Sequence, residues 1–167
     1  QIQKSRQLDI TEETYLRIIG DKTASLFSTC TEIGASSATD DPEKRRLLKE
    51  FGENVGMAFQ IRDDLLDYLG RKSIIGKPTG TDMKEKKLTL PLIYALTHAQ
   101  RKDSRLVLKI IKNGAKQKEI QWVIDFVENN GGIEYALAKA EQYALLARQN
   151  LASFPDSDAK EALLQFV

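Results

Sequence analysis

The chain has 167 residues, of which 41% are hydrophobic and 29% are charged, as is usual for a globular protein with a packed core. Its formal net charge is only +1, so composition indicates no nucleic-acid-binding surface, and no nucleic-acid partner is expected. The longest uncharged run, residues 88–100, is too short for a membrane span and no signal-peptide pattern is recognisable, so we expect a cytoplasmic protein.

Helical periodicity extends along the chain, and no useful stretch alternates with the period of two that a β-strand requires. The first predicted helix begins at Asp9 or Thr11, two residue types that cap helices, and ends near residue 35. The second begins at Asp41 and Pro42 and ends near residue 69. Residues 1–8 carry no helix start signal, and we interpret them as the end of a helix in a longer protein.

Residues 70–87 form the longest predicted loop, and loops of this length in compact domains are often functional. A helix then begins at Thr89 with Pro91 in its first turn. Further helices are predicted at about 103–113, 117–130 and 132–152, and a short segment follows Pro155. The predicted fold class is therefore all-α, a helical bundle in which residues 1–167 form a single all-helical unit.

Lys22 lies near the centre of the apolar stripe of the first predicted helix, together with Tyr15 and Leu26. An unpaired buried charge is costly, so an inward-facing lysine requires an anion, and we predict that Lys22 binds one. Two simpler alternatives stay open: the side chain reaches past the core to water, or it pairs with a structural carboxylate. Thr23 adds a hydroxyl beside it, and Cys30, on the same stripe, is predicted to be a core residue.

Three carboxylates, Asp63, Asp64 and Asp67, interrupt an otherwise apolar part of the second predicted helix. At about 100° per residue they fall, with Gly56 and Gln60, in one stripe about 100° wide. A helix that is apolar over most of its circumference is buried. This acidic stripe is therefore predicted to face an internal cavity or cleft.

Such a stripe is electrostatically costly on its own. Asp63 and Asp67, four positions apart, lie roughly 5–6 Å from one another at Cβ and repel by about 3 kcal/mol at an effective dielectric near 20. A divalent cation removes this cost, and Mg²⁺ typically takes one or two carboxylates and completes its shell with water and phosphate oxygens. We predict Mg²⁺ and a diphosphate here. The alternatives are a solvated acidic face or a local ion-pair network, and Gly56 either leaves room for a ligand or marks a close helix contact.

The predicted loop supplies further cations. Lys77 follows Gly76, where the backbone can approach a ligand closely, and Lys84, Lys86 and Lys87 crowd near the end of the loop. Charge runs in loops are usually solvated. This run is close in sequence to the acidic stripe, however, and can close over a metal-bound diphosphate.

Four stretches together resemble the trans-isoprenyl diphosphate synthases, the polyprenyl synthetase family. They read KTASLF (22–27), FGENVGMAFQIRDDLLDYLG (51–70), GKPTGTD (76–82) and KKLTLPLIYAL (86–96). The resemblance covers at least residues 1–100, and TGTDMKEKKLTLP is similar to bacterial long-chain synthases of the octaprenyl or solanesyl type. It implies an all-α isoprenoid-synthase fold around a large central cavity, usually in a homodimer.

The resemblance also implies a reaction, in which isopentenyl diphosphate condenses with an allylic diphosphate to give a polyprenyl diphosphate. In the family, Mg²⁺ ions bridge the allylic diphosphate to two aspartate-rich motifs. Asp63, Asp64 and Asp67 match the second motif. Asp63 is the expected direct ligand, with the other two bound directly or through water.

Further site residues are implied by the same resemblance. Lys22, Lys77 and Lys87 match the lysines that bind the allylic diphosphate. Thr23 and Gln60 match residues beside the allylic carbon, where they stabilise the developing cation. The prenyl cation then forms in an apolar cavity from which water is excluded, and no protein nucleophile is required.

The sequence departs from the family pattern in one respect, because no first aspartate-rich motif occurs in it. We therefore interpret the chain as the C-terminal half of a synthase and expect that it cannot catalyse condensation alone. A non-catalytic helical subunit that pairs with a catalytic partner is the alternative from another class. A class I terpene cyclase fits less well, because the second metal motif of those enzymes mixes Asn, Ser or Thr with Glu, unlike DDLLD.

Overall fold

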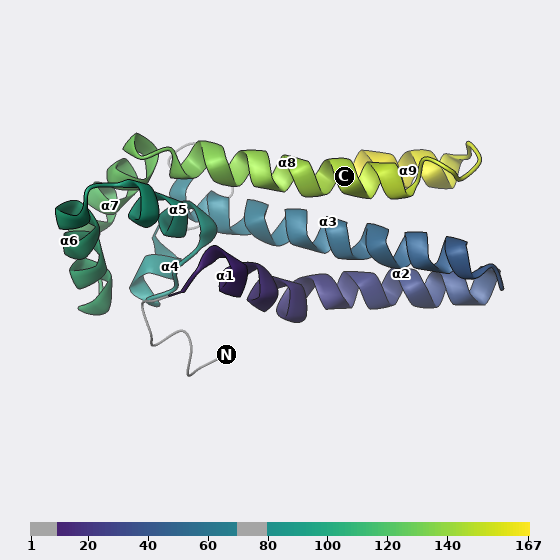
Figure 1. Ribbon diagram of the computed structural model, residues 1–167, viewed down its shortest axis with the longest axis horizontal. Helices are drawn as coiled ribbons and strands as arrows, with labels where there is room; N and C mark the ends of the chain where they lie inside the picture. Colours follow the sequence, from purple (N-terminus) through teal and green to yellow (C-terminus); the bar gives the residue numbers. More distant parts are fainter. Residues whose placement is uncertain (1–9, 70–79) are drawn as a thin grey trace. The chain divides into compact units, whose positions relative to one another are not determined.

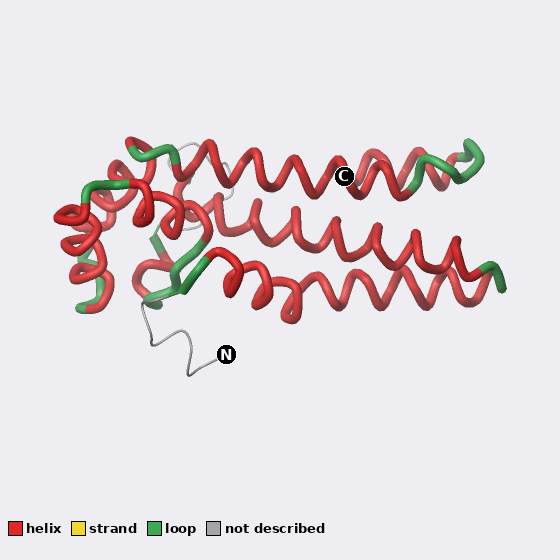
Figure 2. The backbone as a smooth tube through the Cα atoms, in the orientation of Figure 1, coloured by secondary structure: helices red, strands yellow, loops and turns green. Residues whose placement is uncertain are grey.

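The computed structural model describes residues 10–69 and 80–167, which are helical and contain no strand (Figure 2). The predicted all-α class is confirmed. None of the described helices has both the length and the apolar character that crossing a bilayer requires. The elements in chain order are α1 (Glu12–Ile19), the π-helical turn η1 (Gly20–Ala24), α2 (Ser25–Ala38), α3 (Pro42–Leu69), α4 (Thr81–Lys84), α5 (Leu90–His98), α6 (Arg101–Lys112), α7 (Gln117–Asn129), α8 (Gly132–Asn150) and α9 (Asp158–Phe166).

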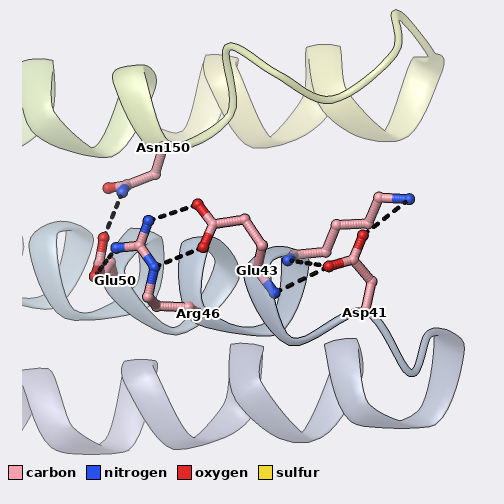
Figure 3. Close-up of polar contacts among 6 residues, drawn as sticks. Asp41, Glu43, Arg46, Glu50 and Asn150 are labelled. Atoms are coloured by element: carbon pink, nitrogen blue, oxygen red, sulfur yellow. Dashed lines mark hydrogen bonds and ion pairs between the residues drawn. The ribbon is translucent and has the colours of Figure 1, made fainter.

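The start of α3 confirms the predicted cap. The Asp41 carboxylate accepts hydrogen bonds from the backbone N–H groups of Glu43 at 2.9 Å and Lys44 at 3.3 Å, and Pro42 begins the helix. These bonds satisfy N–H groups that have no partner within the helix. A salt bridge also joins the Lys44 and Asp41 side chains (Figure 3). The beginning of this long helix is therefore determined by local sequence.

Two other predicted boundaries differ in detail. The predicted loop over 70–87 contains a short helix, α4, within its described part. Thr89 lies at the N-cap of α5 as predicted, yet its hydroxyl hydrogen-bonds the Tyr68 hydroxyl at 2.6 Å instead of capping the helix. A buried phenol must find a hydrogen-bond partner, and this tertiary contact takes precedence over the local cap.

The described residues divide into two compact units, and α1, α3 and α8 each contribute to both. Unit 1 comprises residues 10–16, 61–69 and 80–138. Unit 2 comprises residues 17–60 and 139–167. The single all-helical unit expected from the sequence stays a prediction.

Unit 1 has α5 in its core, in contact with α6 and α7 (Figure 1). Leu90 and Leu92 on α5 are fully buried, as is Ile120 on α7. Gly80 has φ of +79°, and a β-carbon there would lie 2.3 Å from the Ile120 side chain. Both the backbone conformation and the lack of space therefore require glycine where the chain enters α4.

Unit 2 is built around α2, the first part of α3, the second part of α8, and α9. Its core contains Phe51 and Val55 from α3 with Ala147 and Leu151 from the α8 end. On the surface, a line of polar contacts follows α3. Arg46 pairs with both Glu43 and Glu50, and the Asn150 amide donates to Glu50 at 3.1 Å (Figure 3). These exposed pairs contribute little energy, so the apolar core holds unit 2 together.

Candidate functional site

The end of α3 in unit 1 carries the three predicted metal-binding carboxylates in three different environments. Asp63 is exposed, Asp67 is half-buried, and Asp64 is buried with 8% of its surface accessible. The stripe predicted from helical angles is therefore uneven in its access to solvent. Asp63, the expected direct ligand, is the most exposed of the three carboxylates.

Asp64 is held by a tyrosine from the first helix. The Tyr15 hydroxyl donates a hydrogen bond to Asp64 Oδ2 at 2.7 Å, and both side chains are buried. Burial, followed by the charge of Asp64, raises the pKa of Tyr15 well above its ordinary value. The phenol therefore keeps its proton and stays a donor to the carboxylate.

Sequence reasoning placed Tyr15 on an apolar stripe but did not assign it this role. The available signal was chemical, because a tyrosine on a buried face needs a partner for its hydroxyl. The identity of that partner depends on how α1 and α3 pack, which the sequence alone does not give.

Asp67, at the end of α3, binds the backbone at the start of the next described segment, residues 80–82. Its two carboxylate oxygens accept from the backbone N–H groups of Thr81 at 2.9 Å and Asp82 at 3.0 Å. Its backbone carbonyl accepts from Gly80 N–H at 3.2 Å. Burial raises the pKa of Asp67, although the N–H bonds act in the opposite direction. Asp67 thus links the acidic helix end to the segment that carries Lys87.

Lys87 is the predicted diphosphate-binding lysine that the structure describes in unit 1. Its Nζ lies 2.6 Å from Glu85 and 3.2 Å from Asp82. The hydrogen bond that Lys87 donates to Glu85, followed by the one it donates to Asp82, raises the pKa of Lys87, so this side chain carries a positive charge at neutral pH. Lys86 just before it adopts a left-handed backbone with φ of +60°. Lys77, the other predicted lysine of this loop, lies outside the described residues.

Asp82 makes two hydrogen bonds that the sequence analysis did not predict. Its N–H binds the Asp67 carboxylate, while its own carboxylate binds Lys87. The chain of contacts Asp67–Asp82–Lys87 joins the predicted metal ligands to a predicted diphosphate ligand within one unit. The sequence showed these residues as a motif, GKPTGTD followed by KK, but not as a network.

The carboxylate oxygens of this site suit a hard divalent cation that takes its remaining ligands from water and phosphate oxygens. Among residues 10–69 and 80–167, no group of three His, Cys, Asp or Glu side chains is arranged to hold a metal ion unaided. Mg²⁺ does not require such a cage, because it commonly takes one or two carboxylates and fills its shell with water and phosphate oxygens. Carboxylate oxygens at Asp63 and Asp67 match that chemistry.

The turn η1 in unit 2 changes which helix face is buried. The buried positions are Tyr15 and Ile19 before the turn and Ala24, Ser28 and Ala35 after it. The interval from Ile19 to Ala24 is five residues, where an α-helix would use three or four. The π-helical turn therefore moves the buried face on by one residue.

This shift makes two predictions wrong. Lys22 is exposed instead of inward-facing, and Cys30 is exposed instead of belonging to the core. Leu26 and Ile33 on the same stripe are each 65% exposed. The physical reason is the extra residue in η1, which rotates the predicted apolar stripe away from the core of unit 2.

Thr23 and Gln60, for which the sequence predicts a shared role, lie in contact in unit 2. The Thr23 hydroxyl donates to Gln60 Oε1 at 2.7 Å, from η1 to α3. One turn earlier on α3, a β-carbon added at Gly56 would lie 2.5 Å from the Ala24 Cα. Gly56 is thus a close helix contact, and this contact brings η1 near enough to α3 for the hydrogen bond. Because the Thr23 hydroxyl directs its hydrogen toward Gln60, the lone pairs of the Thr23 oxygen can face a cation.

An all-α fold with an aspartate-rich helix end is consistent with the family that the motifs resemble. Comparison with known protein families establishes the membership. The sequence model of the family described as Polyprenyl synthetase matches residues 1–127. The chain belongs to the polyprenyl synthetase family. Its relatives are named as isoprenyl and polyprenyl diphosphate synthases, which are prenyltransferases.

Two curated relatives and one solved structure illustrate the similarity. A short chain isoprenyl diphosphate synthase of Methanothermobacter thermautotrophicus is 38% identical over 94% of this chain and 48% of its own length. An all-trans-nonaprenyl-diphosphate synthase (geranyl-diphosphate specific) of Rhodobacter capsulatus is also 38% identical, over 98% of this chain and 50% of the relative. A polyprenyl synthase of Caulobacter crescentus CB15, complexed with calcium and isoprenyl diphosphate, is 35% identical with a TM-score of 0.91, over 99% of this chain and 51% of that one. The chain spans about half the length of the relatives it matches.

Proposed function

We propose that this chain forms the part of a polyprenyl diphosphate synthase that binds the metal ion and the allylic diphosphate. The complete enzyme would condense isopentenyl diphosphate with an allylic diphosphate. The observation that carries the proposal is the network in unit 1, in which Asp67 binds the backbone of Asp82 and Asp82 binds Lys87. It places anionic and cationic groups together, as a metal-bound diphosphate requires.

Asp63 and Asp67 are proposed as the residues that hold Mg²⁺, with Asp64 completing the motif. When bound, the metal ion would neutralise the charge that develops on the departing diphosphate. Tyr15 keeps the buried Asp64 in place through its 2.7 Å hydrogen bond. Asp67 retains its N–H donors from α4 only while the loop end is folded, which couples metal binding to loop order.

Lys87 is proposed to bind the diphosphate directly, as are Lys22 and Lys77. In the ligand-free chain its charge is balanced by Glu85 and Asp82. A diphosphate carries more negative charge than either carboxylate and can accept the same hydrogen bonds. The lysine would therefore exchange protein carboxylates for substrate oxygens when the ligand arrives.

Thr23 and Gln60 are proposed to stabilise the allylic cation. Their oxygens are 2.7 Å apart, which orients the Thr23 hydroxyl toward Gln60. A fixed dipole needs no reorganisation when charge develops, so it stabilises a cation more effectively than mobile water does. Conversion of Thr23 to valine would remove this dipole with little change of shape.

Three further features of the whole enzyme belong to the same proposal. The chain by itself is inactive in condensation, the complete protein is a homodimer, and it is located in the cytoplasm. Incubating the 167-residue chain with isopentenyl and farnesyl diphosphates tests the first point, and robust polyprenyl product would contradict it. Sedimentation of the complete protein tests the second.

Calorimetric titration with an allylic thiodiphosphate, with and without Mg²⁺, tests the function proposed for this chain. We expect binding that requires Mg²⁺ and that Asp63→Asn weakens by about tenfold or more. Asp125→Asn is the matched control, because Asp125 is an exposed carboxylate on α7 outside the motif. Binding that is independent of Mg²⁺, or equally affected by both substitutions, would exclude the proposed site.

A further inference from the structure

Helix α6 in unit 1 has two sharply different faces. Ser104, Val107 and Ile111 are buried, and α6 packs against α5 on this side. The exposed side carries the basic face, which we define as the side chains of Arg101, Lys102, Arg105, Lys109 and Lys112. Figure 1 draws α6 at the edge of unit 1, at the left of the view. Because all five side chains are exposed, this positive charge lies on the surface of unit 1.

The charges of the basic face are concentrated within the helix circumference. At about 100° per residue, they occupy an arc about 100° wide. Asp103 is the acidic residue of α6, and it lies roughly 100° beyond the edge of that arc. Within the described ranges, no carboxylate forms an ion pair with any member of the basic face. This differs from Lys44, Arg46 and Arg148, which have acidic partners in unit 2.

Apolar side chains border the basic face on both sides. Leu106 is 47% exposed on one edge, and Leu108 is partly exposed on the other. Lys116 and Lys118, also exposed, extend the positive charge into the start of α7. A helix with a lysine- and arginine-rich polar face and exposed leucines beside it has the pattern of helices that lie in a membrane interface.

We propose that the basic face of α6 binds the surface of an anionic lipid bilayer, with the helix axis in the plane of the headgroups. The charges would contact lipid phosphates, while Leu106 and Leu108 would enter the boundary with the acyl chains. Nucleic acid is a poorer fit, because α6 carries no aromatic side chain for base stacking and its flanks are apolar. This inference does not depend on the proposed enzymatic function.

The strength of the interaction scales with the number of basic residues at the surface. Each lysine or arginine close to an anionic bilayer raises affinity by about fivefold. Replacing Arg105, Lys109 and Lys112 by glutamine should therefore weaken binding roughly a hundredfold. Because these side chains are exposed and unpaired with acids in the described structure, the substitutions leave the core of unit 1 intact.

Flotation with lipid vesicles tests the inference. We expect the chain to float with vesicles of phosphatidylcholine and phosphatidylglycerol at a two-to-one ratio, and not with phosphatidylcholine alone. Binding should decrease as salt increases, because exposed charges are screened over about 10 Å at 0.1 M. The matched control is the triple substitution Arg17→Gln, Lys44→Gln and Arg148→Gln, which removes the same charge from unit 2 and should retain binding. Far-UV circular dichroism verifies that both triple variants are folded.

Several results would overturn the inference. Equal losses in the two triple variants would show that net charge, and not the basic face, is responsible. Equal binding to both vesicle types, or no binding to either, would exclude an anionic bilayer as the partner. Tighter binding to a short RNA or DNA duplex than to the anionic vesicles would assign the face to nucleic acid instead.

Discussion

The close contact between α3 and η1 predicts opposite effects for two glycine-to-alanine substitutions in unit 2. A β-carbon at Gly56 would lie 2.5 Å from the Cα and 3.0 Å from the Cβ of Ala24. A β-carbon at Gly34, in α2, would meet no atom within 4 Å. Both glycines are helical, so the gain in helix propensity, about 0.8–1 kcal/mol, is common to the two variants. The difference in unfolding free energy between them therefore isolates the cost of the contact.

That cost is set by backbone atoms, which cannot move away by changing a rotamer. Overpacking of this kind typically costs about 1–3 kcal/mol. We expect Gly34→Ala to stabilise unit 2 by about 1 kcal/mol, and Gly56→Ala to be about 1–3 kcal/mol less stable than Gly34→Ala. At about 2–4 °C per kcal/mol for a chain of this size, the melting temperatures should differ by several degrees.

Urea denaturation followed by far-UV circular dichroism measures both variants under the same conditions. Because Ala24 follows Thr23 directly, a separation of η1 from α3 should also lengthen the Thr23–Gln60 hydrogen bond. Equal stability of the two variants would refute the close contact and the role assigned to Gly56.

Three further predictions follow from unit 1. Tyr15→Phe removes the hydrogen-bond donor to buried Asp64, and we expect the free energy of unfolding, measured by urea denaturation, to fall by about 1.5–3 kcal/mol. The control Tyr94→Phe should change it little, and equal losses in the two variants would contradict a special role for the Tyr15 hydroxyl. Asp67→Asn replaces one acceptor oxygen by an amino group, so hydrogen exchange at the Thr81 and Asp82 amides should accelerate by about tenfold, while unchanged exchange would remove Asp67 as the loop anchor. Burial raises the pKa of Tyr68 above its ordinary value, so as the pH rises the unfolded chain loses the Tyr68 proton before the folded chain does. The contribution of Tyr68 to the free energy of unfolding should be complete below about pH 10 and should fall above it, so stability should decrease more steeply in the wild type than in Tyr68→Phe. Identical alkaline slopes for the two proteins would contradict this.

Much of the fold follows from local sequence. Asp41 and Pro42 begin α3 as predicted, and Asn113 with Gly114 ends α6, because helix caps and stops involve residues within a few positions of one another. The acidic motif was also recognisable, since three carboxylates in an apolar stretch of helix are costly on their own and predict a compensating ion. These features depend on contacts of short range, and a linear sequence contains them.

The differences among the three carboxylates come from tertiary structure. Asp63, Asp64 and Asp67 share one stripe by helical angle, yet they are exposed, buried and half-buried. Tyr15 is 49 positions away from Asp64, and α4 is 14 or 15 positions away from Asp67. Periodicity along one helix carries no information about which distant segment covers it.

The first predicted helix shows most clearly which features depend on the sequence alone and which depend on the tertiary structure. By itself the sequence predicted a helix from Asp9 or Thr11 to about residue 35, because the spacing of apolar residues is that of a helix. The structure is helical from Glu12 to Ala38. The tertiary structure decided which side of that helix is buried. One additional residue in η1 rotates the faces that follow, so Ala24 and Ser28 turn inward and Lys22 and Cys30 turn outward. A π-helical turn costs energy locally and persists because of packing, here the approach of Ala24 to Gly56, which only the folded chain provides.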